Sequence, residues 1–221
     1  MRRCVVAILA IVLAASPVAA SPAQSPVGED FEHGVPPGWA TEGLGPRPDK
    51  GRLEDAQETG GNHFLRISTD GSFYSFGIDT PFDPEQYPVL TWRWRVDRMP
   101  QRADISTRNG DDAAARLFVV FRDAAHPSTT RKLEYVWDTA HPAGSIIPDP
   151  YSPDTTKALV LESGSEKLGQ WVPEKVNLVS DYQRAFGTGP GRVKTIAFAS
   201  NSEETHSATV ADFDDLQIIG K

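Results

Sequence analysis

The stretch from Tyr87 to Arg98, Tyr-Pro-Val-Leu-Thr-Trp-Arg-Trp-Arg-Val-Asp-Arg, alternates large apolar residues with polar ones. Successive side chains of a β-strand point to opposite faces of its sheet. The alternation therefore places Trp92 and Trp94 on one face and Arg93 and Arg95 on the other. Two buried indoles supply a large apolar area, whereas two guanidiniums need water or anionic partners. This pattern predicts a β-sheet with one buried face and one wet face.

Strand signals dominate the rest of the chain. Ser180 is placed to cap one short helix, Asp181–Phe186, with Gly187 at its stop position. Many short strands with one helix predict an all-β fold, an antiparallel two-sheet β-sandwich of jelly-roll type, with its helix near residues 180–186. The expected strands are rich in β-branched and aromatic residues and cover 64–67, 73–78, 89–96, 115–121, 133–137, 157–161, 171–176, 193–200 and 209–219.

The first residues have the features of a signal peptide. Arg2 and Arg3 precede an apolar run from Cys4 to Ala15, and Val18 and Ala20 occupy the −3 and −1 positions of a cleavage site. We therefore expect a signal peptide over 1–20, a flexible leader over 21–28 and a single domain over 29–221. The mature protein is expected in the periplasm or outside the cell, without membrane insertion. It has no disulfide, since Cys4 is the only cysteine.

The net negative charge of the chain limits which macromolecules it is expected to bind. The formal net charge of the chain is −8, and loss of Arg2 and Arg3 with the signal peptide makes it −10. Basic patches supply the affinity for nucleic acid and for anionic lipid, so neither is an expected partner. Arg93, Arg95, Arg98 and Arg102 can still form a local basic patch within this acidic background.

Two connections are longer than a hairpin needs, namely 98–111 and the proline-rich 138–156. The second contains Ile146, Ile147 and Tyr151, which favour a loop that packs down on the core over a mobile one. Two interpretations stay open for it: a lid on one end of the core, or the rim of a ligand site.

Several blocks in order resemble one bacterial secreted family, catalogued as domain of unknown function 3047. The resemblance covers about residues 30–219 and implies an exported single-domain protein with no assigned activity. The blocks are 87–96, Asn109–Asp112 leading into 115–121, 135–137, 168–172, 177–186 and 193–205.

The two ends of the expected domain, 29–39 and 211–218, resemble the first and last strands of jelly-roll carbohydrate-binding modules. This fold-level resemblance implies that the terminal strands pair and that a structural Ca²⁺ lies where they meet. Calcium takes six to eight oxygen ligands, which carboxylates supply. The alternative is a solvated acidic edge that discourages aggregation. The residues for the clip are Glu29, Asp30 and Glu32 at one end and Asp214 and Asp215, with Asp212, at the other.

The remaining candidate ligand-binding residues are Asp111, Asp112 and Arg116, which follow the Trp-Arg-Trp-Arg strand in the sequence. We expect Arg93, Asp112, Arg116 and Tyr135 to lie in one cluster on the sheet face away from the main core. If Arg93 or Arg95 shares a sheet face with Arg116, Arg forks can hold an anionic glycan while Tyr135 or Trp137 stacks on its sugar ring. The alternative is a salt-bridge ladder that orders the fold, in which Asp112 pairs with Arg93 or Arg116.

Two functions follow from these features. The first is an exported, non-catalytic binding or envelope-associated module for an anionic carbohydrate or a cell-envelope component. The second is an enzyme that cleaves or modifies polysaccharides with Asp111, Asp112, Arg93 and Tyr135. The sequence has no Gly-x-Ser-x-Gly elbow, no nucleotide-binding glycine fingerprint and no paired histidines with metal-ligand spacing.

Overall fold

The computed structural model describes residues 26–44, 48–124, 126 and 128–221, so the expected signal peptide and most of the leader lie outside the described residues. The helical segments are a short 3₁₀ turn, Pro48–Lys50, and α1, Leu178–Phe186. The strands are β1 Gly28–Glu29, β2 Ala40–Leu44, β3 Gly51–Gln57, β4 His63–Asp70, β5 Phe73–Phe82, β6 Val89–Arg98, β7 Ala113–Arg122, β8 Thr130–Asp138, β9 Ile146–Pro148, β10 Thr156–Ser163, β11 Val172–Asn177, β12 Val193–Asn201 and β13 Ala208–Ile219.

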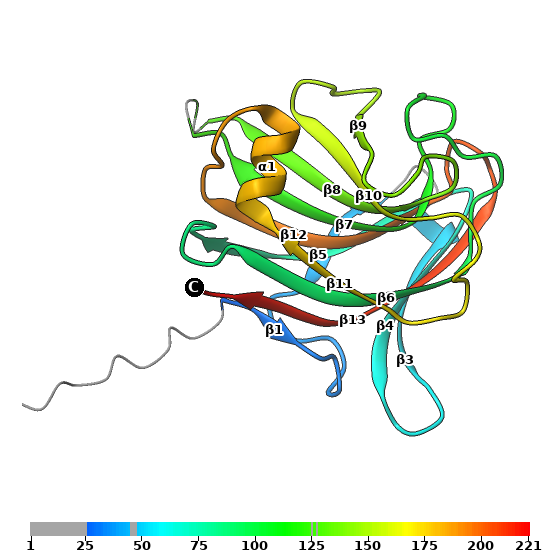
Figure 1. Cartoon of the computed structure of the whole chain (residues 1–221). Coiled ribbons are helices and arrows are strands. Elements are labelled where there is room, and N and C mark those ends of the chain that lie inside the picture. Colours follow the sequence, from blue (N-terminus) through cyan, green and yellow to red (C-terminus); the bar gives the residue numbers. More distant parts are fainter. Residues whose placement is uncertain (1–25, 45–47, 125, 127) are drawn as a thin grey trace, which may run out of the picture.

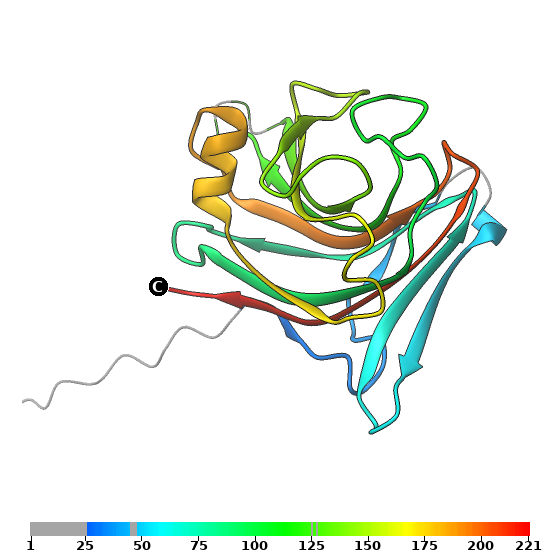
Figure 2. The same ribbon diagram turned by 45° about the vertical axis from the view of Figure 1, so that its right-hand side comes forward.

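Two sheets face each other in Figures 1 and 2. In the described part of the chain, one sheet has the order β11-β6-β13-β4-β3, with β1 added beside β13, and the other β2-β5-β12-β7-β8-β10-β9. Strands β4 to β7 alternate between the sheets, and the late strands return between them, β13 between β4 and β6 and β12 between β5 and β7. This is jelly-roll connectivity. Neighbours are antiparallel except β8 and β10, which are parallel. The predicted fold class is confirmed.

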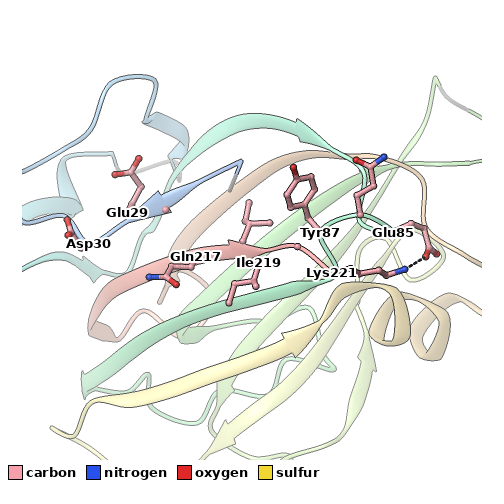
Figure 3. A pocket seen from close by; sticks show the side chains of 11 residues that line it. Glu29, Asp30, Glu85, Tyr87, Gln217, Ile219 and Lys221 are labelled. Atoms are coloured by element: carbon pink, nitrogen blue, oxygen red, sulfur yellow. Dashed lines mark ion pairs between the residues drawn. The ribbon is translucent and has the colours of Figure 1, made fainter. Parts of the chain in front are cut away.

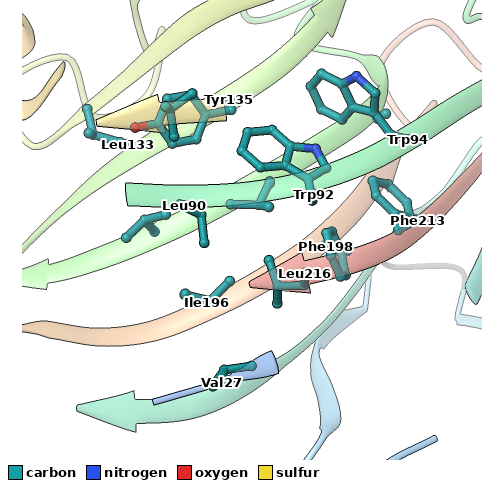
Figure 4. Close-up of a cluster of buried hydrophobic side chains, with 14 of the residues drawn as sticks. Val27, Leu90, Trp92, Trp94, Leu133, Tyr135, Ile196, Phe198, Phe213 and Leu216 are labelled. Carbon is teal, nitrogen blue, oxygen red and sulfur yellow. The ribbon is translucent and has the colours of Figure 1, made fainter. Parts of the chain in front are cut away.

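The core lies between the sheets and contains the two indoles that the alternation predicts to be buried (Figure 4). Trp92 and Trp94 are at most 2% exposed, and their rings meet edge to face at 5.4 Å. Burial of 150–250 Å² per indole stabilises the fold by roughly 4–6 kcal/mol for each, before entropic costs. Arg93 and Arg95 lie on the opposite, outer face of the sheet, as predicted.

A bulge in strand β13 shifts the alternation of the side chains that point into the core. Ala211 and Phe213 point into the core before the bulge, and Leu216 and Ile218 do so after it. Such an extra residue shifts the side-chain alternation by one position. Asp215 lies within the irregularity, with φ of 53°. Beyond the bulge β13 pairs with β1, so the expected pairing of the terminal strands is confirmed.

The helix begins earlier than predicted. Its N-cap is Asn177, whose side chain accepts a hydrogen bond from the Ser180 backbone N–H, so the assignment of Ser180 as the cap was wrong. Gly187 ends the helix with φ of 74°, as predicted. Tyr182 packs on Phe121 of β7 at 4.9 Å and closes one end of the sandwich.

Within the described ranges, no helix has the length and apolar character needed to cross a bilayer.

The 138–156 connection packs down in part. Ile146 contacts the main core and Ile147 contacts a smaller cluster with Ile105. Tyr151 is instead 51% exposed and lies over the Arg108 guanidinium at 5.2 Å. The loop therefore adds the edge strand β9 to the seven-stranded sheet and presents one aromatic ring to solvent.

Candidate functional site

Arg93 and Arg95 are engaged by carboxylates of the chain itself. The register of β13 on β6 places Asp214 opposite Arg93 and Asp212 opposite Arg95. Asp212 forms ion pairs with Arg95 and with Arg66 of β4, both at 2.7 Å, and Asp214 pairs with Arg93. We call these five residues the arginine ladder. Both carboxylates are almost completely buried, so each guanidinium satisfies a charge that would otherwise lie unpaired.

Aromatic rings cover the arginine ladder. The ring of Trp171 lies 4.6 Å from the guanidinium carbons of both Arg93 and Arg95. Phe64 lies 5.0 Å from Arg95 and meets Trp171 edge to face at 5.4 Å. Because their charges and their flat faces are occupied, these arginines have little capacity left for a ligand. The geometry favours the ladder interpretation, with Asp212 and Asp214 as the partners in place of Asp112.

Arg116 belongs to the outer face of the other sheet. It is almost fully buried and forms ion pairs with Asp111 and Glu134, both at 2.7 Å, and Lys132 pairs with Glu134 at the same distance. Burial alone would raise the pKa of Glu134, but Lys132 and Arg116 outweigh it and leave that pKa lowered. For Asp111 burial outweighs Arg116, and its pKa is raised. Arg116 and Glu134 at the centre of this network are almost fully buried, so the network stabilises the sheet.

Asp112 points away from Asp111. It accepts hydrogen bonds from the backbone N–H groups of Glu204 and Thr205, at 3.2 and 2.7 Å, and from the Thr205 hydroxyl at 2.6 Å. Burial, together with the neighbouring Asp112, raises the pKa of Glu204 to about 8. Asp112 thus holds the β12–β13 loop in place.

Tyr135 and Trp137 face the core. Both are at most 1% exposed. The Tyr135 hydroxyl donates to Asp181 of α1 at 3.2 Å, and the Trp137 indole N–H donates to the Gly164 carbonyl at 3.0 Å. They occupy the inward positions of β8, so neither ring has a free face on which a sugar can stack.

The expected single cluster of Arg93, Asp112, Arg116 and Tyr135 does not form, and that prediction was wrong. Arg93 and Arg116 lie on the outer faces of different sheets, and Tyr135 lies between the sheets. The set of Asp111, Asp112, Arg93 and Tyr135 that the enzyme alternative requires is therefore not assembled.

The residues expected for a calcium clip have other partners. Glu32 accepts from the His63 backbone N–H at 3.1 Å, and Asp30 from that of Glu32 at 3.2 Å. Asp214 and Asp215 both pair with Arg93. Among the described residues, no group of three or more His, Cys, Asp or Glu is arranged to hold a metal ion. The clip stays a prediction, which thermal unfolding in Ca²⁺ and in EDTA tests.

An open cleft lies at the far end of β13, where the terminal strands pair. Its volume is about 870 Å³, within the usual range for small-molecule sites. We call it the end cleft. Figure 3 shows Glu29 and Asp30 on the β1 side and Tyr87 with the Glu85–Lys221 ion pair on the other. The lining comes from 28–30, 85–87 and 217–221.

Apolar and acidic surfaces meet in the end cleft. Tyr87 is partly exposed, and its ring packs close to Gly220, where an added Cβ would lie 3.4 Å from the ring. Ile219 is 41% exposed. Burial raises the pKa of Glu29, and the neighbouring charge of Asp30 raises it further. Sequence reasoning missed Tyr87 and Gln217 as lining residues, because the three segments are far apart in the chain and share no motif.

Solved structures with a similar arrangement include three bacterial proteins. The family 11 carbohydrate-binding module of a Clostridium thermocellum cellulosomal cellulase is 11% identical, with 93% of this chain and 97% of that one covered and a TM-score of 0.43. Tandem family 22 carbohydrate-binding modules from Paenibacillus barcinonensis are 11% identical, covering 91% and 48%, with a TM-score of 0.43. The K3 cleaved adhesin domain of Lys-gingipain from Porphyromonas gingivalis is 16% identical, covering 89% and 99%, with a TM-score of 0.40.

The strand order of the two sheets, in which β12 and β13 lie between earlier strands, defines the jelly roll. No curated protein matches the sequence. A family model, described as Protein of unknown function (DUF3047), matches residues 38–217, from just before β2 to two residues before the end of β13. The match spans both sheets and the helix, in agreement with the resemblance seen in the sequence blocks. The chain belongs to this family of unknown function.

Proposed function

We propose that this protein is an exported carbohydrate-binding module and that its ligand, a neutral or amine-bearing saccharide, lies in the end cleft. One observation carries the proposal: the end cleft combines an aromatic ring and an exposed isoleucine with several oxygen acceptors. Sugars present apolar C–H faces and hydroxyl donors. Tyr87 and Ile219 suit the former, while the carboxylates and the Gln217 amide suit the latter.

Charge defines the class of saccharide. Glu29, Asp30 and Glu85 line the end cleft together with Lys221, which pairs with Glu85 at 3.6 Å. The excess of carboxylates repels uronate and sulfate groups and accepts hydrogen bonds from hydroxyl or ammonium donors. The anionic glycan considered from the sequence is therefore not the ligand proposed for this cleft.

Location fits the same function. The features of the first 20 residues support export to the periplasm or the cell exterior, where polysaccharides and cell-envelope components are the available partners. N-terminal sequencing of the protein recovered from the producing cell tests this part, because export requires a new N-terminus near Ser21.

Titration calorimetry with neutral polysaccharide fragments (mixed-linkage β-glucan, xylan) and chitosan oligomers tests the ligand. Removal of the Tyr87 ring should weaken binding by about ten-fold or more, the usual effect of losing a central aromatic contact. Tyr151→Ala is the matched control, because Tyr151 is another tyrosine with a solvent-accessible ring but lies on the 138–156 loop, over Arg108.

Equal binding by Tyr87→Ala and the unmodified protein would remove the end cleft from the proposal. Binding of none of these saccharides would remove the proposed function itself. Circular dichroism of each variant checks that the sandwich is retained, since Tyr87 also packs against Phe82 at 6.3 Å.

A further inference from the structure

The other end of β13 has a second, chemically opposite site. One pocket of about 290 Å³ is lined by Gln101, Arg102 and the loop 205–207, and another of about 350 Å³ by residues 49–52 and 68–69. Both pockets are also lined by Asp70, Arg98 and Ala208, so they lie next to each other. We call the two together the basic groove.

Two of the arginines in the basic groove have no anionic partner. Among the described residues, no carboxylate lies within ion-pair distance of Arg98 or Arg102. Both side chains are exposed. The sheet register explains the difference from the arginine ladder, because Val210 lies opposite Arg98, whereas Asp212 lies opposite Arg95. The basic groove therefore presents two guanidinium forks that are free to bind an anion.

Further cations line the second pocket. Lys50 meets Asp70 only at 4.0 Å, and Arg52 meets Glu54 at 3.4 Å, both in exposed positions where such pairs contribute little. The groove as a whole has four Lys or Arg side chains against the carboxylates of Asp49 and Asp70. Its local charge is positive in a chain whose net charge is −8.

The wall of the first pocket is held in a fixed conformation. The Thr205 hydroxyl donates to Asp112 at 2.6 Å and lies 2.6 Å from the Ser207 hydroxyl, which accepts from the Gln101 backbone N–H at 3.2 Å. Arg102 and His206 have φ values of 57° and 52°, in the left-handed region that non-glycine residues seldom adopt. A site whose loops are already fixed binds with a smaller entropic cost.

We propose that the basic groove binds a segment of an acidic polysaccharide, whose carboxylate or sulfate groups are held by Arg98 and Arg102. Two adjacent pockets with cations spaced along them suit a polymer with repeated anionic groups. Among the described residues, neither pocket is lined by Phe, Tyr or Trp, so the groove lacks the large stacking platform that single-stranded nucleic acid uses. This site goes beyond the proposed function, because its residues, position and ligand charge all differ from those of the end cleft.

Titration of the purified full-length mature chain with polygalacturonate and with heparin fragments tests the proposal. We expect binding at low ionic strength that weakens strongly near about 0.5 M sodium chloride, where exposed charges are screened. The double variant Arg98→Ala with Arg102→Ala should reduce the affinity by about ten-fold or more. The affinity of the double lysine variant should lie between those of the unmodified protein and the double alanine variant, because lysine keeps the charge but loses the bidentate fork.

Arg184→Ala is the matched control, because Arg184 is an exposed arginine on α1, away from the groove. Tyr87→Ala should leave polygalacturonate binding unchanged, which separates this proposal from that for the end cleft. Unchanged affinity in the Arg98/Arg102 variants would overturn it. So would binding of single-stranded DNA as tight as that of the polysaccharides, or a response to inorganic sulfate alone as strong as that to the polymers.

Discussion

The two ends of β13 have opposite charge. At its C-terminal end, Glu29, Asp30 and Glu85 give the end cleft an excess of carboxylates, whereas Arg98 and Arg102 give the groove at its N-terminal end an excess of guanidiniums. A net charge of −8 describes neither end. Overall charge therefore argues against large basic surfaces but does not determine what a local site binds.

The arginine ladder lies between these ends and shows how the same residue type becomes structural. Arg93 and Arg95 face aspartates across the sheet, and Arg98 faces Val210. A shift of two residues along the facing strand, from Asp212 to Val210, separates a neutralised guanidinium from a free one. Stability and ligand binding should therefore respond to different arginines.

The largest effect should come from breaking the arginine ladder. Asp212→Ala removes a buried carboxylate that pairs with both Arg66 and Arg95, and it should lower the free energy of unfolding by about 3 kcal/mol. Arg98→Ala should change it by no more than about 0.5 kcal/mol, since Arg98 is exposed and has no ion-pair partner in the described part of the chain. Urea denaturation measures both. Equal losses would show that the two groups of arginines are not distinct.

A smaller effect should follow from extending the arginine ladder by one position. Val210→Asp places a carboxylate opposite Arg98 in the sheet, on the wall of the basic groove. Polygalacturonate affinity should fall by about five- to ten-fold, because the new charge pairs with Arg98 and repels the ligand. Val210→Asn is the control with nearly the same shape. A loss as large in the asparagine variant would mean that shape, and not charge, governs binding.

Stability should also depend on pH through Glu204, beside the basic groove. Its pKa is raised from 4.5 to about 8, so the folded state holds a proton that the unfolded state releases between these values. The stabilisation is complete below the lower value and is lost as pH rises through about 8. Thermal unfolding from about pH 5 to pH 9 should show a falling midpoint, and Glu204→Gln should flatten the curve. An unchanged curve in this variant would contradict the assignment.

The sequence was sufficient to predict the sheets, because alternation and β-branched residues report burial directly. All of the expected strands occur, with ends that differ by a few residues. Strand β3 was missed because it is a polar edge strand, Gly-Arg-Leu-Glu-Asp-Ala-Gln, with only weak alternation of burial. Strands β2 and β9 were missed because they are short and also lie at sheet edges. Strand β1 was expected within 29–39 from the resemblance but is confined to Gly28–Glu29.

The sites were harder to predict, since they depend on register and on long-range closure. Alternation placed Arg93 on the outer face correctly but did not identify Asp214 as its partner, which is 121 residues away in the sequence. Asp111 and Asp112 are adjacent in sequence yet point to different networks. The free state of Arg98 depends on the residue opposite it in β13, which no local pattern shows.

The smallest effects should come from the end cleft. Glu85 and Lys221 are both mostly exposed, so Glu85→Gln should change the free energy of unfolding by less than about 0.5 kcal/mol. Combined with Asp30→Asn, it should leave affinity for neutral saccharides within about two-fold, because amide oxygens still accept hydrogen bonds. Affinity for a uronate-bearing oligosaccharide should rise by about three-fold as the repulsion is reduced. Calorimetry with a neutral and a uronate-bearing ligand measures both affinities. It is done in the Arg98/Arg102 double alanine variant, so that uronate binding at the basic groove does not contribute. If the affinity for the uronate-bearing ligand does not rise, shape and not charge selects the ligand at this end of β13. Charge would then determine ligand binding at the basic groove alone.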